Sequence, residues 1–246
     1  MELILIAVGV LVGALSGFFG IGGGMILVPI LIFLGFDIKV AIVISIVQMV
    51  FSSIYGSYLN YKKGSLLLGE GIWVGIGGFI GGYLGAYFSV KVSSTVLEYL
   101  FFGLLVFALY RLFAAKVHDD DATVKTLHPA LLFGVGTVIG IFSISLGVGG
   151  SILLTPILAS FLHYPIKKAV SAGLFFVVFS SIAGLISHIM VGDMELGQGI
   201  YVAVASLIGV YIGIWLKDHV TSSKHKLYLV IMYSAALLIL VKKIWF

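Results

Sequence analysis

The stretch from Gly20 to Leu31 reads GIGGGMILVPIL, and 127 residues further along the chain Gly147 to Leu158 reads GVGGSILLTPIL. Each copy joins a glycine cluster to a short apolar run that contains a proline. Glycine permits tight bends and proline disrupts helices. Each copy therefore predicts a break in an apolar helical segment, at the same place in each half of the chain.

The composition is that of a membrane protein. Hydrophobic residues make up 61% of the chain and charged residues 10%, against roughly 25% charged in a soluble domain. A helix needs about 20 apolar residues to cross a bilayer. Uncharged or nearly uncharged runs of about this size cover 3–36, 40–61, 71–90, 92–111, 129–162, 169–192, 196–216 and 227–241. They predict an all-α polytopic membrane protein in contact with the lipid bilayer.

Several classes of function and processing are disfavoured by the same residues. The chain has no cysteine, which excludes disulfides and thiolate metal sites. The Met-Glu-Leu start lacks a basic region and a cleavage site, so we expect no removable signal peptide. The net charge of +4 is spread over short loops, which does not suggest a nucleic-acid partner. No nucleotide-binding or metal-ligand spacing is present, so we expect no cofactor and no metal.

The two halves of the chain resemble each other beyond the opening motif. At an offset of 128 residues, FSSIYG at 51–56 aligns with FSSIAG at 179–184. Such self-similarity is typical of a duplicated membrane fold. We divide the chain into repeat 1 (1–114), a polar cytoplasmic linker (115–128) and repeat 2 (129–246).

The opening run of each repeat, 3–34 and 129–162, is too long for one crossing and too short for two. If each run crosses once, the 14 Lys and Arg residues divide evenly between the two faces. If each run enters, turns at its glycines and returns, ten share one face and four the other, a usable positive-inside bias. The ten are Lys62, Lys63, Arg111, Lys116, Lys125, Lys167, Lys168, Lys217, Lys224 and Lys226, and the four are Lys39, Lys91, Lys242 and Lys243.

The hairpin topology gives each repeat a helical hairpin and three transmembrane helices. These helices are expected at about 38–61, 67–90 and 94–114 in repeat 1, and at about 166–190, 196–217 and 224–244 in repeat 2. Three crossings are an odd number, so repeat 2 would be inverted relative to repeat 1, with both termini outside. Lys242 and Lys243 then run against the charge bias. GxxxG spacing at 81–85 and 209–213 predicts close helix packing, within one chain or between two.

The glycine turns are the predicted substrate site. A turn inside the hydrocarbon must be buried or line a watery cavity, because its backbone polar groups lack helical partners. The helix that starts after each turn directs free N–H groups and a positive dipole end at that cavity, which suits an anion. The site residues are Gly20, Gly22, Gly23, Gly24, Gly147, Gly149, Gly150 and Ser151. Pro29 and Pro156 are helix breaks, and a simple packing kink is the alternative for each.

The first transmembrane helix after each hairpin adds polar side chains. One helix face, repeating every four residues, carries Gln48, Ser52, Gly56 and Asn60. The matching face in repeat 2 carries Phe176, Ser180, Gly184 and His188. Gln48, Ser52 and Ser180 are substrate-binding candidates, although a serine can instead bond its own helix backbone. The change from Gln48 to Phe176 predicts an asymmetric pocket. His188 and Glu98 are the candidates for proton coupling, against a solvated histidine and a loop-paired carboxylate.

These residues also resemble a known family. The paired glycine and proline segments, the Lys-x-Ala that follows at 39–41 and 167–169, and the serine-rich second helix are similar to the sulfite exporter TauE/SafE family of membrane permeases. The resemblance covers nearly the whole chain. It implies transport of sulfur-containing anions such as sulfite or organosulfonates, often with proton coupling, and it maps the glycine turns to the substrate region.

The sequence therefore predicts a secondary transporter for a small anion that works by alternating access. We expect it in the cytoplasmic membrane of a bacterium or archaeon. An anion channel with the same site is the alternative. An intramembrane enzyme is disfavoured because Ser, His and acidic residues do not converge at one depth. The substrate, the direction of transport, the coupling ion and the oligomeric state remain open.

Overall fold

The computed structural model describes residues 2–66, 68–114, 128–161, 166–191 and 196–245. Within these residues the chain is helical and contains no strand. The helices are α1 (Glu2–Phe19), α2 (Gly24–Phe33), α3 (Ile38–Lys62), α4 (Leu68–Lys91), α5 (Ser94–Ala114), α6 (Pro129–Ser145), α7 (Ser151–Phe161), α8 (Ile166–Val191), α9 (Leu196–His219) and α10 (Ser222–Trp245). The linker residues 115–127 lie outside the described part of the chain.

Five of the described helices are long and apolar enough to cross a membrane, judged by length and composition: α1, α3, α4, α8 and α9. Large apolar side chains are exposed on the outside of the bundle, including Phe107 (52%), Val204 (53%) and Leu238 (69%). Gln48 and Ser52, by contrast, are fully buried. An apolar exterior, together with polar side chains buried in the interior, suits lipid and not water. The all-α polytopic membrane fold predicted from the composition is confirmed.

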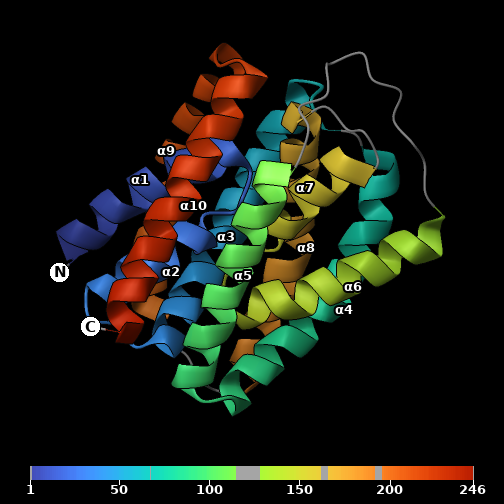
Figure 1. The fold of residues 1–246 in the computed structure, drawn as a ribbon. Coiled ribbons are helices and arrows are strands. Elements are labelled where there is room, and N and C mark those ends of the chain that lie inside the picture. Colours follow the sequence, from blue (N-terminus) through green and yellow to red (C-terminus); the bar gives the residue numbers. More distant parts are fainter. Residues whose placement is uncertain (1, 67, 115–127, 162–165, 192–195, 246) are drawn as a thin grey trace.

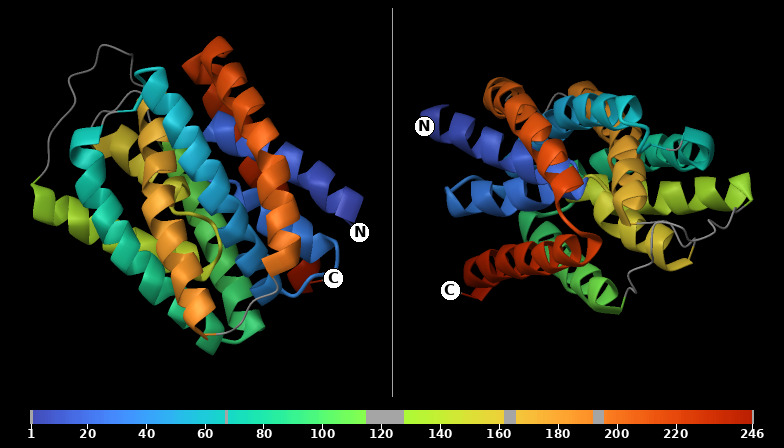
Figure 2. Two further views of the ribbon diagram at one scale, coloured as in Figure 1. Left: turned by 180° about the vertical axis from the view of Figure 1, so that it is seen from behind. Right: turned by 90° about the horizontal axis from the view of Figure 1, so that it is seen from above.

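Two pairs of helices enter the bundle from opposite sides (Figure 1). The pair α1 and α2 enters on the side that carries the chain ends, and the pair α6 and α7 enters from the other side. A glycine turn joins the two helices of each pair near the centre of the bundle (Figures 1 and 2). The long helices α3 and α8 pass through the bundle beside these turns.

Helices of the first half of the chain pack closely on helices of the second half through faces lined by glycine. Helix α1 packs along α9, and α4 packs along α6. A Cβ added at Gly13 would overlap the backbone of Ser206, and one added at Gly81 would overlap the carbonyl oxygen of Thr137. The backbones therefore touch, as the GxxxG spacing predicts. This packing occurs within one chain.

The two ends of the bundle are held by different polar contacts. At one end the Ser94 hydroxyl donates to the Asp37 carboxylate at 3.1 Å, which joins the start of α5 to the start of α3. At the other end the Lys63 ammonium lies 2.5 Å from the Asp218 carboxylate, which joins the end of α3 to the end of α9. We call the first the terminal face, because both chain ends lie towards it (Figure 1). The second is called the opposite face.

Candidate anion-binding site

Both glycine motifs break a helix. Helix α1 ends at Phe19 and α2 begins at Gly24, and α6 ends at Ser145 and α7 begins at Ser151. Only glycine enters the left-handed backbone region without steric cost. Six glycines of the two turns adopt it, with φ between 67° and 93°: Gly20, Gly22 and Gly23 in the first turn, and Gly147, Gly149 and Gly150 in the second.

The starts of the two short helices carry unsatisfied backbone donors. In α2, the N–H groups of Ile26 and Leu27 donate to the carbonyl of Gly23 at 3.1 and 3.0 Å. Those of Gly24 and Met25 find no partner among the residues that the structure describes. Helix α7 begins with the same pattern. Such helix starts are partly positive and favour negative charge.

The two turns lie directly against each other. A Cβ added at Gly24 would overlap the carbonyl oxygen of Gly147, although the two residues lie in opposite halves of the chain. Helix α3 holds both turns through serine hydroxyls. Ser45 donates to the carbonyl of Gly147 at 2.7 Å, and Ser52 donates to that of Gly22 at 3.1 Å. The sequence-derived substrate residues of the two turns therefore converge.

Gln48 places a free amide at the start of α2. A Cβ added at Gly23 would lie 2.6 Å from Gln48 Oε1 and 3.0 Å from Nε2. The side chain is fully buried, and neither amide atom has a hydrogen-bond partner in the described part of the chain. An idle buried amide costs free energy, about 1–3 kcal/mol by protein mutational data. A group retained at that cost is a strong candidate for ligand contact.

The second turn is lined differently. Phe176 stands where the first half has Gln48, and a Cβ added at Gly150 would overlap its ring. Helix α7 carries its own hydroxyls instead, on Ser151 and Thr155. Both hydroxyls are buried without a partner among the described residues. The lining is therefore asymmetric, with an amide beside α2 and two hydroxyls on α7.

Other residues singled out from the sequence lie differently. The Ser180 hydroxyl donates to the carbonyls of Phe176 and Val177 in its own helix, at 3.3 and 3.4 Å. This is the alternative in which the serine bonds its own helix backbone. Pro29 is buried inside α2. Pro156 falls within α7, and its side chain lies outside what the structure describes.

The two candidates for proton coupling are not at the turns. His188 lies in the last turn of α8 and is only 3% exposed, so the solvated alternative is wrong. Glu98 is half-buried near the start of α5, and its charged neighbours are Lys243 and Asp37. It therefore belongs to the terminal face.

Sequence reasoning missed the role of Lys217, which it counted as a loop charge. Lys217 is 1% exposed, and its ammonium donates to Asn60 Oδ1 at 2.7 Å and to Ser171 Oγ at 3.2 Å. Asn60 ends the polar face of α3 that begins at Gln48. A lysine at the end of an apolar run usually extends to the membrane surface. No sequence signal separates the buried case from that one.

The chain matches the model of the family described as sulfite exporter TauE/SafE over residues 5–240. It is 33% identical to a probable membrane transporter protein of Methanocaldococcus jannaschii, over 76% of this chain and 72% of that protein. It is 27% identical to a probable membrane transporter protein of Bacillus subtilis, over 86% and 88% of the two chains. A probable membrane transporter protein of Haemophilus influenzae is 28% identical, over 77% and 74%. No solved structure matches the chain.

The fold and these relatives define an integral membrane transporter of the permease class. The chain belongs to the sulfite exporter TauE/SafE family. The resemblance stated from the sequence is thereby confirmed.

Proposed function

We propose that this protein is a secondary transporter for a small anion, bound at mid-depth between the starts of α2 and α7. The observation that carries the proposal is the fully buried Gln48 amide, which has no partner in the described part of the chain and lies beside Gly23. A helix start alone is a weak indication of a site. The buried Gln48 amide at the start of α2, unpaired among the described residues, is a second, independent indication of a binding site.

The donors suit a small oxyanion. The free N–H groups of Gly24 and Met25 and the Gln48 amide offer several donors to one group of oxygens. Hydrogen bonds to charged groups are worth about 1.5–3 kcal/mol each, so a few of them can replace the hydration of a small anion. Together with the family description, this supports a sulfur-containing oxyanion, either sulfite or an organosulfonate.

Apolar side chains pack against α3 between this site and the opposite face. Gly56 lies on α3 between Ser52 and Asn60, and a Cβ there would be 2.5 Å from Leu174 and 3.3 Å from Val210. An anion does not cross such a barrier without a conformational change. We therefore propose alternating access, in which α3 separates from α8 and α9 to open a route to the opposite face.

The arrangement of the two hairpins supports two inverted-topology repeats, 1–114 and 129–246. In this topology both termini lie outside, so the terminal face is the outer face. A cytoplasmic membrane is the proposed location, since the relatives come from two bacteria and an archaeon. Proton coupling is proposed through His188, the buried candidate.

Counterflow of labelled sulfite into proteoliposomes that hold unlabelled sulfite tests this function. A carrier gives saturable counterflow, stimulated by internal substrate, whereas a channel gives uptake that follows the membrane potential without such stimulation. Repeating the assay with methanesulfonate, sulfate and acetate tests substrate class, and an imposed pH gradient tests coupling. Ser53→Ala is the matched control, because the Ser53 hydroxyl bonds its own helix at the Val50 carbonyl. Absence of any anion flux would overturn the proposal.

A further inference from the structure

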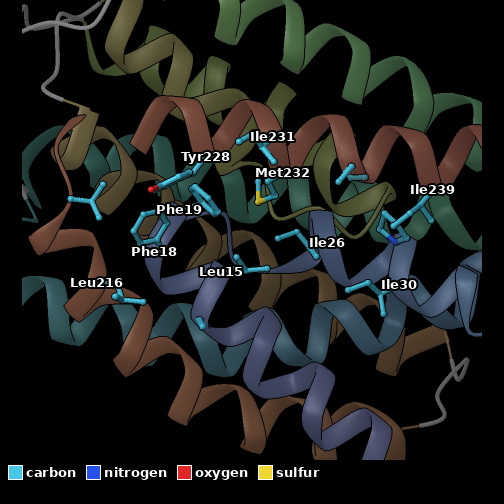
Figure 3. A pocket seen from close by; sticks show the side chains of 15 residues that line it. Leu15, Phe18, Phe19, Ile26, Ile30, Leu216, Tyr228, Ile231, Met232 and Ile239 are labelled. Carbon is cyan, nitrogen blue, oxygen red and sulfur yellow. The ribbon is translucent and has the colours of Figure 1, made fainter. Parts of the chain in front are cut away.

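An apolar groove runs between α10 and the α1–α2 hairpin (Figure 3). Its volume is about 620 Å³, within the ~300–1,000 Å³ typical of small-molecule sites. Leu15 of α1, Ile26 of α2 and Met232 of α10 face one another across it (Figure 3). Tyr228 carries the one hydroxyl among its lining side chains. The lining therefore selects a hydrocarbon occupant.

The dimensions of the groove fit a single extended chain. Along α10 it reaches from Tyr228 to Ile239, a rise of about 17 Å at 1.5 Å per residue. This is close to half of the ~30 Å hydrocarbon core, the depth of one leaflet.

Two lysines stand at one end of the groove. Ile239 also lines a smaller cavity of about 280 Å³, whose other lining residues are Ile32, Phe33, Lys242 and Lys243. The Lys242 ammonium lies 5.9 Å from the centre of the Phe33 ring. These are the two lysines that run against the charge bias of the topology. A binding role for a negative headgroup would explain why they are present on this face.

We propose that the groove and the lysine pair bind an anionic phospholipid of the surrounding bilayer. One acyl chain fills the groove, and the phosphate lies at Lys242 and Lys243. Glu98 acts electrostatically on Lys243 and opposes this binding, which leaves Lys242 the stronger contact. The bound chain packs on Ile26 and Pro29, so the lipid supports the short helix α2 whose first residues face the proposed transport site.

Native mass spectrometry of the purified full-length protein tests this inference. Delipidated protein is mixed with phosphatidylglycerol or with phosphatidylcholine of the same acyl chains. We expect phosphatidylglycerol to be retained in preference. Lys242→Gln should lower its retention by roughly fivefold, the effect of one lysine beside anionic lipid. Lys91→Gln is the matched control, since Lys91 is exposed at the end of α4 and lines neither cavity.

Two further variants separate the headgroup from the acyl chain. Glu98→Gln should raise the retention of phosphatidylglycerol. Ala235→Trp fills the groove and should lower the retention of both lipids, whereas Leu238→Trp, on a residue that is 69% exposed and outside the groove, should not. Equal retention of the two lipids, an equal loss in Lys91→Gln, or a dimer mass in place of lipid adducts would overturn the proposal. Because these readouts measure lipid and not anion transport, failure here leaves the proposed function standing.

Discussion

Replacing Gln48 by methionine should change anion affinity and protein stability in opposite directions. Methionine keeps the length of the side chain and removes the amide. If the amide donates to a bound anion, its loss costs about 1.5–3 kcal/mol, or roughly 10- to 150-fold in Kd. Without ligand the amide is idle and fully buried. Its removal should then raise the free energy of unfolding by up to about 1–3 kcal/mol.

Thermal melts of the purified protein, with and without a sulfite series, measure both quantities. We expect Gln48→Met to melt higher than the wild type in the absence of anion, by roughly 2–4 °C per kcal/mol. The shift caused by sulfite should shrink or vanish. Ser53→Ala should keep the wild-type sulfite shift. A variant that melts lower and binds sulfite normally would refute the reasoning, because the amide would then serve the fold alone.

Four further predictions concern the framework of the site. Gly24→Ala should lower the melting temperature and abolish transport, because the new methyl group overlaps the facing turn; a melt and a counterflow assay would show this. Ser52→Ala should cost about 0.5–1.5 kcal/mol of stability by losing the hydrogen bond to the first turn. Ser180→Ala should be nearly neutral in the same melt, since that hydroxyl bonds only its own helix in the described residues. Asn60→Leu removes an acceptor of the buried Lys217 ammonium and should cost roughly 1–3 kcal/mol, part of which Lys217→Met should restore; no recovery in the double variant would contradict the pairing.

The two helix breaks could be predicted from the sequence because glycine and proline change the backbone locally, whatever their tertiary neighbours are. The clusters around Gly23 and Gly150 predicted tight bends, which the structure makes through left-handed glycines. The fourfold spacing from Gln48 to Asn60 also identifies one helix face without any knowledge of neighbours. The difference between Gln48 and Phe176 predicted an asymmetric lining from the repeat alignment by itself.

The remaining features depend on tertiary neighbours that the sequence does not specify. Ser52 and Ser180 occupy matching positions, yet Ser52 bonds the carbonyl of Gly22 as well as its own helix, whereas Ser180 bonds its own helix alone among the described residues. Lys217 and Lys242 both end an apolar run, but only Lys217 is buried, because α3 and α8 supply oxygen acceptors at its position. The groove beside α10 arises from the angle between elements far apart in the chain, which no local pattern encodes.

Anomalous X-ray scattering from crystals soaked in selenite, the selenium analogue of sulfite, tests the central claim most directly. The account predicts a selenium peak in hydrogen-bonding contact with the Gln48 amide and the N–H group of Gly24, and its loss in Gln48→Met crystals. Selenium peaks confined to the lysines of the two faces would contradict it. A thallium peak at the Gln48 amide, in crystals soaked instead in a thallium salt, would also contradict it.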